Sequence, residues 1–117
     1  METEIESIKK EYNPKEDPIV MDFVKFIQTE IPSLVENVIL YGSRARTDFT
    51  EYSDYDFLIV IKKKDKNIKE KIYELGYSIF DIYSKLVSCM VWDTSEWNRK
   101  KEFSLGRIIH KEGIVIL

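Results

Sequence analysis

The sequence has little of what marks an exported or membrane-bound protein. Its 117 residues contain a single cysteine, Cys89, so no disulfide can form within the chain. No apolar stretch approaches the ~20 residues that a membrane-spanning helix requires. The first residues, METEIESIKK, lack the basic region followed by an apolar region that is typical of a secretory signal. These absences predict a cytoplasmic protein with no membrane partner.

Positive charge does not predominate either. Lys and Arg number 18 against 21 Asp and Glu, which gives a net charge of −3 and no overall basic field. Direct binding of nucleic acid is therefore not expected. The segment KKKDKNIKEK at residues 62–71 is a local exception. Such a run is usually a solvated surface, and the alternative is attraction of a polyanionic substrate or partner.

Glycine and proline are sparse, at four and three residues, and no low-complexity linker or repeat divides the chain. Hydrophobic residues make up 44% of it and charged residues 33%, which is typical of a globular protein of one domain. Asp17-Pro18 has the form of a helix N-cap followed by a proline at the first helical position. We therefore predict a tail or short helix over residues 1–16 and one domain over residues 17–117.

Hydrophobic periodicity predicts alternating helices and strands in that domain. Helices are expected at 18–30, at 65–84 and from 94 to Gly113, with a capping box led by Asp93 before the last one. Strands are expected at 38–41, 57–61, 86–92 and 114–117. This alternation predicts an α/β domain with one sheet and helices covering one face.

Two acids, Asp54 and Asp56, stand immediately before the strand expected at 57–61. Residues i and i+2 of a strand point to the same side, with Cα atoms about 6.6 Å apart, so two carboxylates can converge on one hard cation. Mg²⁺ prefers carboxylate oxygens together with substrate phosphates. A solvated Asp pair in a turn is the more frequent explanation of an isolated D-x-D.

Gly42 and Ser43 follow the strand expected at 38–41, and ten residues separate Ser43 from Asp54. A glycine there permits close approach of the backbone to a ligand, and Ser43 is expected to cap a short helix at 44–46 whose free N–H groups bind an anion. An ordinary strand-to-helix turn explains this pair equally well. Each of these residue types has a frequency of roughly 5–7% in proteins. By chance, only about one chain of this length in a thousand would therefore contain the glycine, the serine and the two acids at this spacing.

This arrangement, Gly42-Ser43, ten residues and Asp54-x-Asp56, resembles the signature of the DNA polymerase beta-type nucleotidyltransferase superfamily, and the short chain resembles its minimal nucleotidyltransferase (MNT) branch. The resemblance implies a nucleotidyltransferase fold, α/β (α+β), with helices packed mainly on one face of a single mixed sheet. It also implies that Asp54 and Asp56 bind Mg²⁺, with two ions expected, and that Gly42 and Ser43 hold the triphosphate of an NTP, most simply ATP. Arg44 and Arg46 are candidate phosphate ligands, with a solvated helix face as the alternative.

Enzymes of this superfamily usually carry a third carboxylate on the next strand of the sheet. The strand expected here at 86–92 contains no acid. The candidates for a third metal ligand are Asp81, in the long helix, and Asp93, for which capping of the last helix is the alternative role. If neither residue is a metal ligand, nucleotide binding is still expected. Turnover, in contrast, is not assured without a third carboxylate.

Minimal members of the superfamily often act with a separate all-helical HEPN partner, to which they can transfer AMP at a tyrosine as antitoxins. The resemblance therefore implies a Mg²⁺-dependent protein adenylyltransferase of a toxin–antitoxin system. Two alternatives stay open, a non-catalytic nucleotide-binding module that neutralises a partner by contact and a small-molecule nucleotidyltransferase. The acceptor, the preferred base and any homo-oligomeric state do not follow from the sequence.

Overall fold

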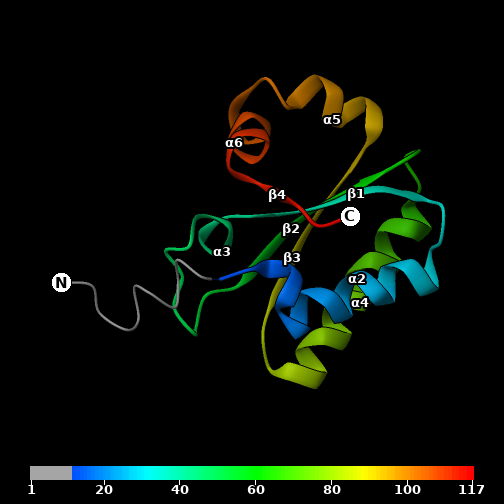
Figure 1. Cartoon of the computed structure of the whole chain (residues 1–117). Coiled ribbons are helices and arrows are strands. Elements are labelled where there is room, and N and C mark those ends of the chain that lie inside the picture. Colours follow the sequence, from blue (N-terminus) through cyan, green and yellow to red (C-terminus); the bar gives the residue numbers. More distant parts are fainter. Residues whose placement is uncertain (1–11) are drawn as a thin grey trace.

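The computed structural model describes residues 12–117 (Figure 1). Most of the predicted tail or helix over residues 1–16 lies outside this range, and its last part, Pro14–Glu16, forms a short 3-10 helix, η1. Helices and strands then alternate along the chain. They are α2 (Pro18–Glu30), β1 (Val35–Tyr41), α3 (Ser43–Arg46), β2 (Tyr55–Ile61), α4 (Lys66–Tyr83), β3 (Val87–Asp93), α5 (Thr94–Lys100), α6 (Ser104–Glu112) and β4 (Ile114–Val115).

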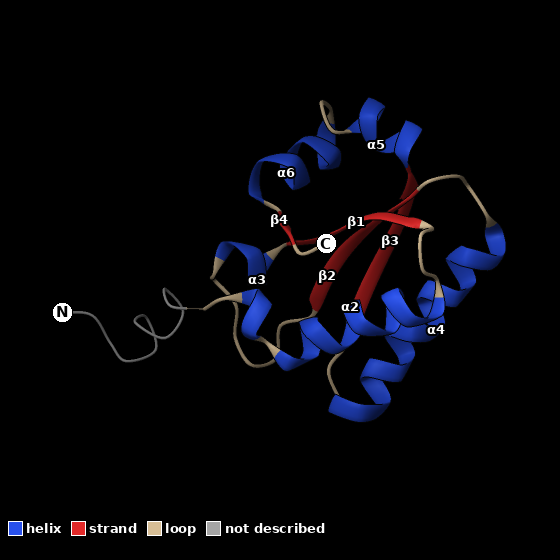
Figure 2. Cartoon of the chain, turned by 45° about the vertical axis from the view of Figure 1, so that its right-hand side comes forward, coloured by secondary structure: helices blue, strands red, loops and turns tan. Residues whose placement is uncertain are grey.

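The four strands form one mixed sheet in the order β3-β2-β1-β4, which confirms the predicted fold class. β1 pairs antiparallel with both β2 and β4, whereas β2 and β3 are parallel and connected through α4. Figure 2 shows the strands side by side, with α2 and α4 together on one side of them and α5 and α6 on another. β3 therefore forms one edge of the sheet.

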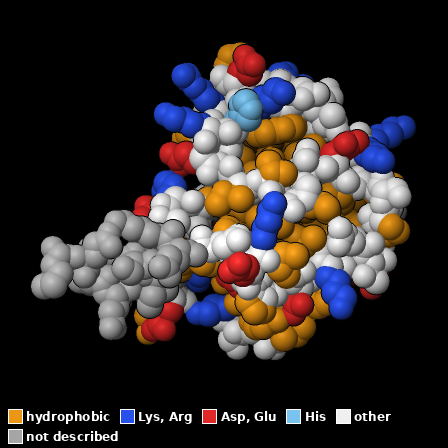
Figure 3. Space-filling model, in the orientation of Figure 1, with side chains coloured by type: hydrophobic (Ala, Val, Ile, Leu, Met, Phe, Trp, Pro, Cys, Tyr) orange, Lys and Arg blue, Asp and Glu red, His pale blue; other side chains and the backbone are white. Residues whose placement is uncertain are grey.

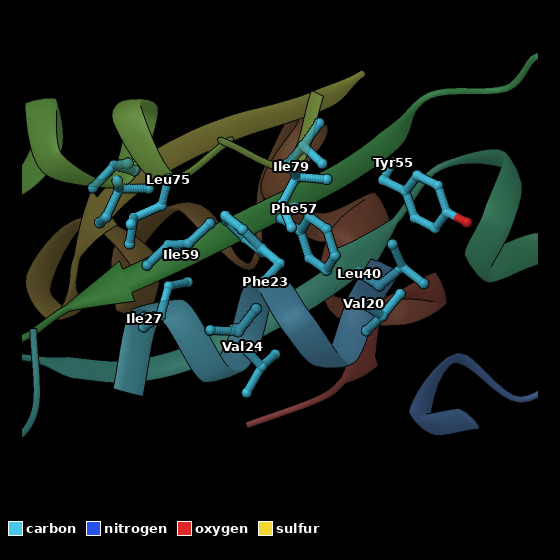
Figure 4. Close-up of a cluster of buried hydrophobic side chains, with 14 of the residues drawn as sticks. Val20, Phe23, Val24, Ile27, Leu40, Tyr55, Phe57, Ile59, Leu75 and Ile79 are labelled. Atoms are coloured by element: carbon cyan, nitrogen blue, oxygen red, sulfur yellow. The ribbon is translucent and has the colours of Figure 1, made fainter. Parts of the chain in front are cut away.

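Each strand presents alternate residues to opposite faces of the sheet. One face carries the larger core, in which Phe57 and Ile59 of β2 pack with Phe23 and Ile27 of α2 and with Ile79 of α4 (Figure 4). A smaller cluster joins the opposite face to α6. It comprises Ile39, Leu58, Val60, Trp92 and Ile109. The two long helices thus cover one face, while α5 and α6 cover part of the other.

The carboxyl-terminal part of the chain differs from the sequence prediction. The single helix expected from residue 94 to Gly113 is broken at residues 101–103 into α5 and α6. Gly106 of α6 lies against the end of α5, because a Cβ on it would come within 2.0 Å of the carbonyl oxygen of Lys100. This close approach requires the chain to turn between the two helices. The last strand is also shorter than predicted, Ile114–Val115 instead of 114–117.

The surface of the described residues is mixed in character. The space-filling view in Figure 3 shows hydrophobic side chains across the middle of one face, between the α5–α6 pair and α2. Most Lys, Arg, Asp and Glu side chains lie around the margin of that face, and a few stand among the hydrophobic ones. Over residues 12–117, no helix combines the length and the apolar character needed to cross a membrane.

Candidate functional site

The turn from β1 into α3 brings the backbone against the acid pair. Gly42 has φ 77° and ψ −157°, a conformation that is essentially restricted to glycine. A Cβ at this position would lie 2.5 Å from Oδ2 of Asp56, which is closer than real Cβ atoms come to any neighbour. Glycine is therefore required twice, for its backbone conformation and for the space it leaves. This contact joins the turn and the Asp56 carboxylate in one site.

α3 begins one residue earlier than the sequence predicts. Ser43 is its first helical residue, Gly42 occupies the N-cap position, and no side-chain hydrogen bond caps the helix. The positive φ of Gly42 lets the chain turn before Ser43, which explains the shift. The Ser43 hydroxyl therefore stands beside the first N–H groups of α3, which have no acceptor within the helix.

The two acids stand at the start of β2. Asp56 is half-buried and Asp54 is exposed. Burial raises the pKa of Asp56, the neighbouring charge of Asp54 raises it further, and Arg46 acts in the opposite direction. Asp56 also pairs across the sheet with Tyr41, whose pKa is raised first by burial and then by Asp56. Negative charge is thus held here in a partly desolvated place, where a cation would stabilise it.

The donor set of this site fits a divalent metal ion. Two carboxylates supply oxygen ligands, and a bound cation would offset both causes of the raised pKa of Asp56, first its burial and then the neighbouring charge of Asp54. Among residues 12–117, no group of three or more His, Cys, Asp or Glu side chains is placed to hold a metal ion. Further ligands of an ion bound here would therefore be water and substrate phosphate, as is common for Mg²⁺.

Neither candidate for a third carboxylate lies beside the pair. The residue of β3 next to Asp56 is the exposed Ser88, and Asp93 lies five residues further, about 16 Å along the strand. The Asp93 carboxylate instead caps α5, where it accepts the N–H of Glu96 at 2.7 Å. Asp81 is exposed on α4, which packs on the sheet face opposite to Asp56. The expectation that Asp81 or Asp93 completes the metal site therefore does not agree with the geometry.

Arg44 is buried, at 5% exposure, and holds the loop between α3 and β2. Its guanidinium lies 4.6 Å from the centre of the Phe49 ring and 4.0 Å from that of Tyr55, an arrangement that suits a planar cation. It also donates a hydrogen bond of 3.0 Å to the carbonyl of Ser53. The sequence-based assignment of Arg44 as a phosphate ligand is thus replaced by a positioning role, because its charged group is enclosed by aromatic rings.

Arg46 remains beside the acids, as its effect on the pKa of Asp56 indicates. Its Nε lies 3.2 Å from Asp48, and its Nη1 lies 3.7 Å from Glu112 at the end of α6. Both ion pairs are exposed, and such pairs contribute only about 0–1 kcal/mol each. A phosphate group can therefore compete for this guanidinium, and Arg46 is retained as a candidate phosphate ligand.

Sequence reasoning missed a hydrogen-bonded group that anchors the acid pair to α2. Oδ2 of Asp17 accepts the hydroxyls of Tyr55, at 2.7 Å, and Tyr12, at 2.8 Å, while its Oδ1 accepts the N–H of Ile19 at 2.9 Å. Burial and then the Asp17 hydrogen bond raise the pKa of Tyr55, so its hydroxyl stays a donor. The Asp-Pro pair signals the helix cap, but no local pattern signals the two tyrosines.

Known proteins are similar to this chain in sequence. The profile of the nucleotidyltransferase domain family matches residues 20–116. Two proteins of Methanocaldococcus jannaschii, both named "Putative protein adenylyltransferase", are similar over most of their length. One is 29% identical over a region covering 86% of this chain and 97% of that protein, and the other is 38% identical over 67% and 89%, respectively.

Solved structures share the fold. A crystal structure of a "putative nucleotidyltransferase" from Sulfolobus solfataricus is 26% identical, with a TM-score of 0.55 over 83% of this chain and 75% of that one. A crystal structure of a toxin–antitoxin with AMP-PNP is 19% identical, with a TM-score of 0.59 over 83% and 71%. Because the family profile spans most of the sequence, including the glycine turn and both acids, this chain belongs to the nucleotidyltransferase domain family.

Proposed function

We propose that this protein is a Mg²⁺-dependent protein adenylyltransferase that transfers AMP from ATP to a tyrosine hydroxyl of a helical, HEPN-type partner, in an antitoxin role. The contact between the Gly42 turn and the Asp56 carboxylate carries the proposal, because it joins an anion-binding turn to a cation-binding acid pair. The two relatives named as protein adenylyltransferases support a protein acceptor. The fold shared with a toxin–antitoxin with AMP-PNP supports the antitoxin role and the adenine nucleotide.

Each site residue has a defined role in this reaction. Asp54 and Asp56 would hold two Mg²⁺ ions, which supply charge stabilisation at the attacking and leaving oxygens. The first N–H groups of α3 and the Ser43 hydroxyl would bind the triphosphate, and Arg46 would add a positive charge at the phosphates. The acceptor oxygen attacks the α-phosphorus, the bond to the bridging oxygen breaks, and pyrophosphate leaves. Arg44 holds the loop that carries the acids in place.

Among residues 12–117, no third carboxylate stands beside Asp56, and this favours a phenolic acceptor. Ser88 stands at that position of β3, and a serine hydroxyl cannot accept a proton as a carboxylate does. A tyrosine hydroxyl has a pKa of about 10 and therefore needs less assistance from a base than a sugar or serine hydroxyl. Because Asp56 would be bound to Mg²⁺, the phenolic proton would pass to water rather than to this carboxylate. The site thus suits a tyrosine better than the aliphatic hydroxyls of small-molecule acceptors.

The same feature supports a second candidate function. With two carboxylates and no third among residues 12–117, the site can hold a nucleotide and an ion without turning over. The protein would then be a nucleotide-binding module that neutralises its partner by contact. A cytoplasmic location and the HEPN identity of the partner stay predictions in either case.

Incubation with α-labelled ATP and Mg²⁺, with and without the candidate partner, separates the two functions. The adenylyltransferase should label the partner in a Mg²⁺-dependent manner, Asp56→Asn should abolish the labelling, and Asp81→Asn, a matched change on the opposite face, should not. Labelling by Asp56→Asn would refute the metal assignment. ATP binding without labelling under any condition would identify the binding module.

A further inference from the structure

Within residues 12–117, the outer edge of β3 carries almost nothing that blocks pairing with another strand. Its sequence is V-S-C-M-V-W-D, in which the terminal Asp93 is the only charged residue. Natural sheets protect their edges with lysines, prolines, bulges or very short strands, and the two-residue β4 at the opposite edge is an example. A neutral, β-prone segment at an open edge associates readily with another chain. The β3 edge can therefore accept an additional strand.

A groove runs along this edge between β3 and α4, which lie side by side in Figure 2. Met90–Asp93 line one hollow of about 440 Å³, and Leu86–Cys89 line a second of about 230 Å³. Tyr73 of α4 lines both, so the hollows adjoin along the strand. The α4 wall consists of Lys66, Lys69, Tyr73 and Tyr77, which recur at helical spacing.

The larger hollow is the charged end of the groove, lined by three lysines and by three acids that already have partners. Asp65 accepts backbone N–H groups as the cap of α4, as Asp93 does for α5, and Glu96 pairs with Lys100 at 3.0 Å. The lysines of this hollow are Lys64, Lys66 and Lys69.

These lysines are available to a ligand. Lys66 has an exposed contact of 3.9 Å with Glu70, and exposed pairs of this kind contribute little. The smaller hollow has no charged residue in its lining. A segment complementary to the groove is therefore acidic at one end and neutral at the other.

The neutral end of the groove includes Ser88, the β3 residue next to Asp56, although α4 itself lies on the opposite face of the sheet. β2 and β3 run in parallel register, with Asp56 next to Ser88. Neighbouring strands are about 4.8 Å apart, so a strand added outside β3 would lie about 10 Å from β2. A tyrosine of that strand, extending over Ser88, would point its hydroxyl toward the nucleotide held at Asp56. The groove thus leads to the proposed site of transfer.

We propose that the β3 edge binds an extended segment of the partner protein as a fifth strand and presents its acceptor tyrosine over Ser88. Acidic residues of that segment would meet Lys66 and Lys69 about five residues, or 16 Å, from the tyrosine. This inference rests on the proposed function and adds the route by which the acceptor arrives. A second copy of this chain fits less well, since antiparallel pairing of two β3 edges would bring its lysines to a hollow without acids.

The test uses the full-length protein and fluorescent synthetic peptides. One peptide of about eight residues carries a tyrosine, neutral β-prone residues and two glutamates about five positions from the tyrosine. It is made in two versions, with the glutamates before or after the tyrosine. One control replaces the glutamates by glutamine, and another is N-methylated at alternate amides so that it cannot pair as a strand. Fluorescence anisotropy without ATP should show the acidic peptide binding about tenfold more tightly than either control.

Paired charge reversals locate the binding site. Lys66→Glu/Lys69→Glu should weaken binding of the acidic peptide about tenfold and should favour a peptide with lysines in place of glutamates. Lys62→Glu/Lys63→Glu makes the same change of charge at two exposed residues outside the groove and should leave the affinity unchanged. Equal effects of the two pairs would indicate a general electrostatic attraction and overturn the proposal.

Transfer of labelled AMP distinguishes failure of the groove from failure of the proposed function. Groove binding without transfer to peptide or partner would refute the function and leave the groove in place. Equal transfer to the acidic and control peptides, or labelling of the partner while no peptide binds, would overturn the groove alone. Analytical ultracentrifugation tests the remaining occupant. If the chain forms dimers and Lys66→Glu/Lys69→Glu dissociates them, the edge binds a second copy, and the partner strand is refuted.

Discussion

Substitution of Gly42 by alanine tests the most constrained point of the site. The backbone there has φ 77°, and the new Cβ would lie 2.5 Å from Oδ2 of Asp56, whereas ordinary contacts begin near 3.4 Å. A backbone in this glycine-only region costs an L-residue roughly 1–3 kcal/mol. The carboxylate must also move by about 1 Å to relieve the clash, so we expect a total loss of about 2–3 kcal/mol in the free energy of unfolding.

The loss should be visible in both stability and function. A change of 1 kcal/mol shifts the Tm of a domain of this size by about 4–8 °C, so calorimetry should detect Gly42→Ala easily. A displacement of 1 Å at a reacting centre can lower a rate about 100-fold. We therefore expect ATP affinity in the presence of Mg²⁺ to fall, and transfer of labelled AMP to drop by about that factor.

Two controls separate the steric and backbone effects. Gly76→Ala in α4 places a Cβ 3.6 Å from its nearest neighbours, and in a helix this change should be neutral or stabilising by up to ~1 kcal/mol. In an Asp56→Ala background the clash is absent, so Gly42→Ala should cost only its backbone part. A wild-type Tm and rate for Gly42→Ala, or a cost that Asp56→Ala does not reduce, would refute the reasoning.

Substitutions at Asp56, Tyr55 and Asp93 probe the site and its surroundings. Because the pKa of Asp56 is raised in the folded protein, the free energy of unfolding falls as the pH rises through that pKa. In thermal melts across pH, Asp56→Asn should have a higher Tm than the wild type at neutral pH and the same Tm in acid. Mg²⁺ should raise the Tm of the wild type only. Tyr55→Phe removes the 2.7 Å hydrogen bond to Asp17 and should lower the free energy of unfolding by about 1–2 kcal/mol; an unchanged urea midpoint would contradict this. Asp93→Asn should keep both the cap of α5 and the transfer of AMP, whereas Asp93→Ala should lower the free energy of unfolding by about 1 kcal/mol. Loss of transfer in Asp93→Asn at an unchanged Tm would make Asp93 part of the chemistry.

The local elements and the motif of this protein were determined by the sequence itself. α2 begins after Asp17 and ends at Glu30 as the cap, the proline and the periodicity predict, and α4 follows the cap Asp65. Such signals act over a few residues, so they can be read without the fold. The spacing of the glycine turn and the acid pair is equally local, because alternation along a strand places i and i+2 on one side.

Only the tertiary structure decided which of the candidate residues act together. Arg44 and Arg46 are two residues apart, yet the first is enclosed by Phe49 and Tyr55 while the second lies beside the acids. Their roles differ because residues two apart on a helix point in different directions, and the sequence does not say which direction meets the aromatic rings.

The pairing of strands was likewise beyond the reach of local patterns. The parallel register of β2 and β3 places Ser88 beside Asp56 and Asp93 at the far end of the strand. In the sequence alone, Asp93 directly follows the acid-free segment 86–92 and is for that reason a candidate third ligand. The strand order leaves the β3 edge open beside α4. Both features arise from contacts between residues far apart in the chain, and such contacts have no signature in the local pattern of residues.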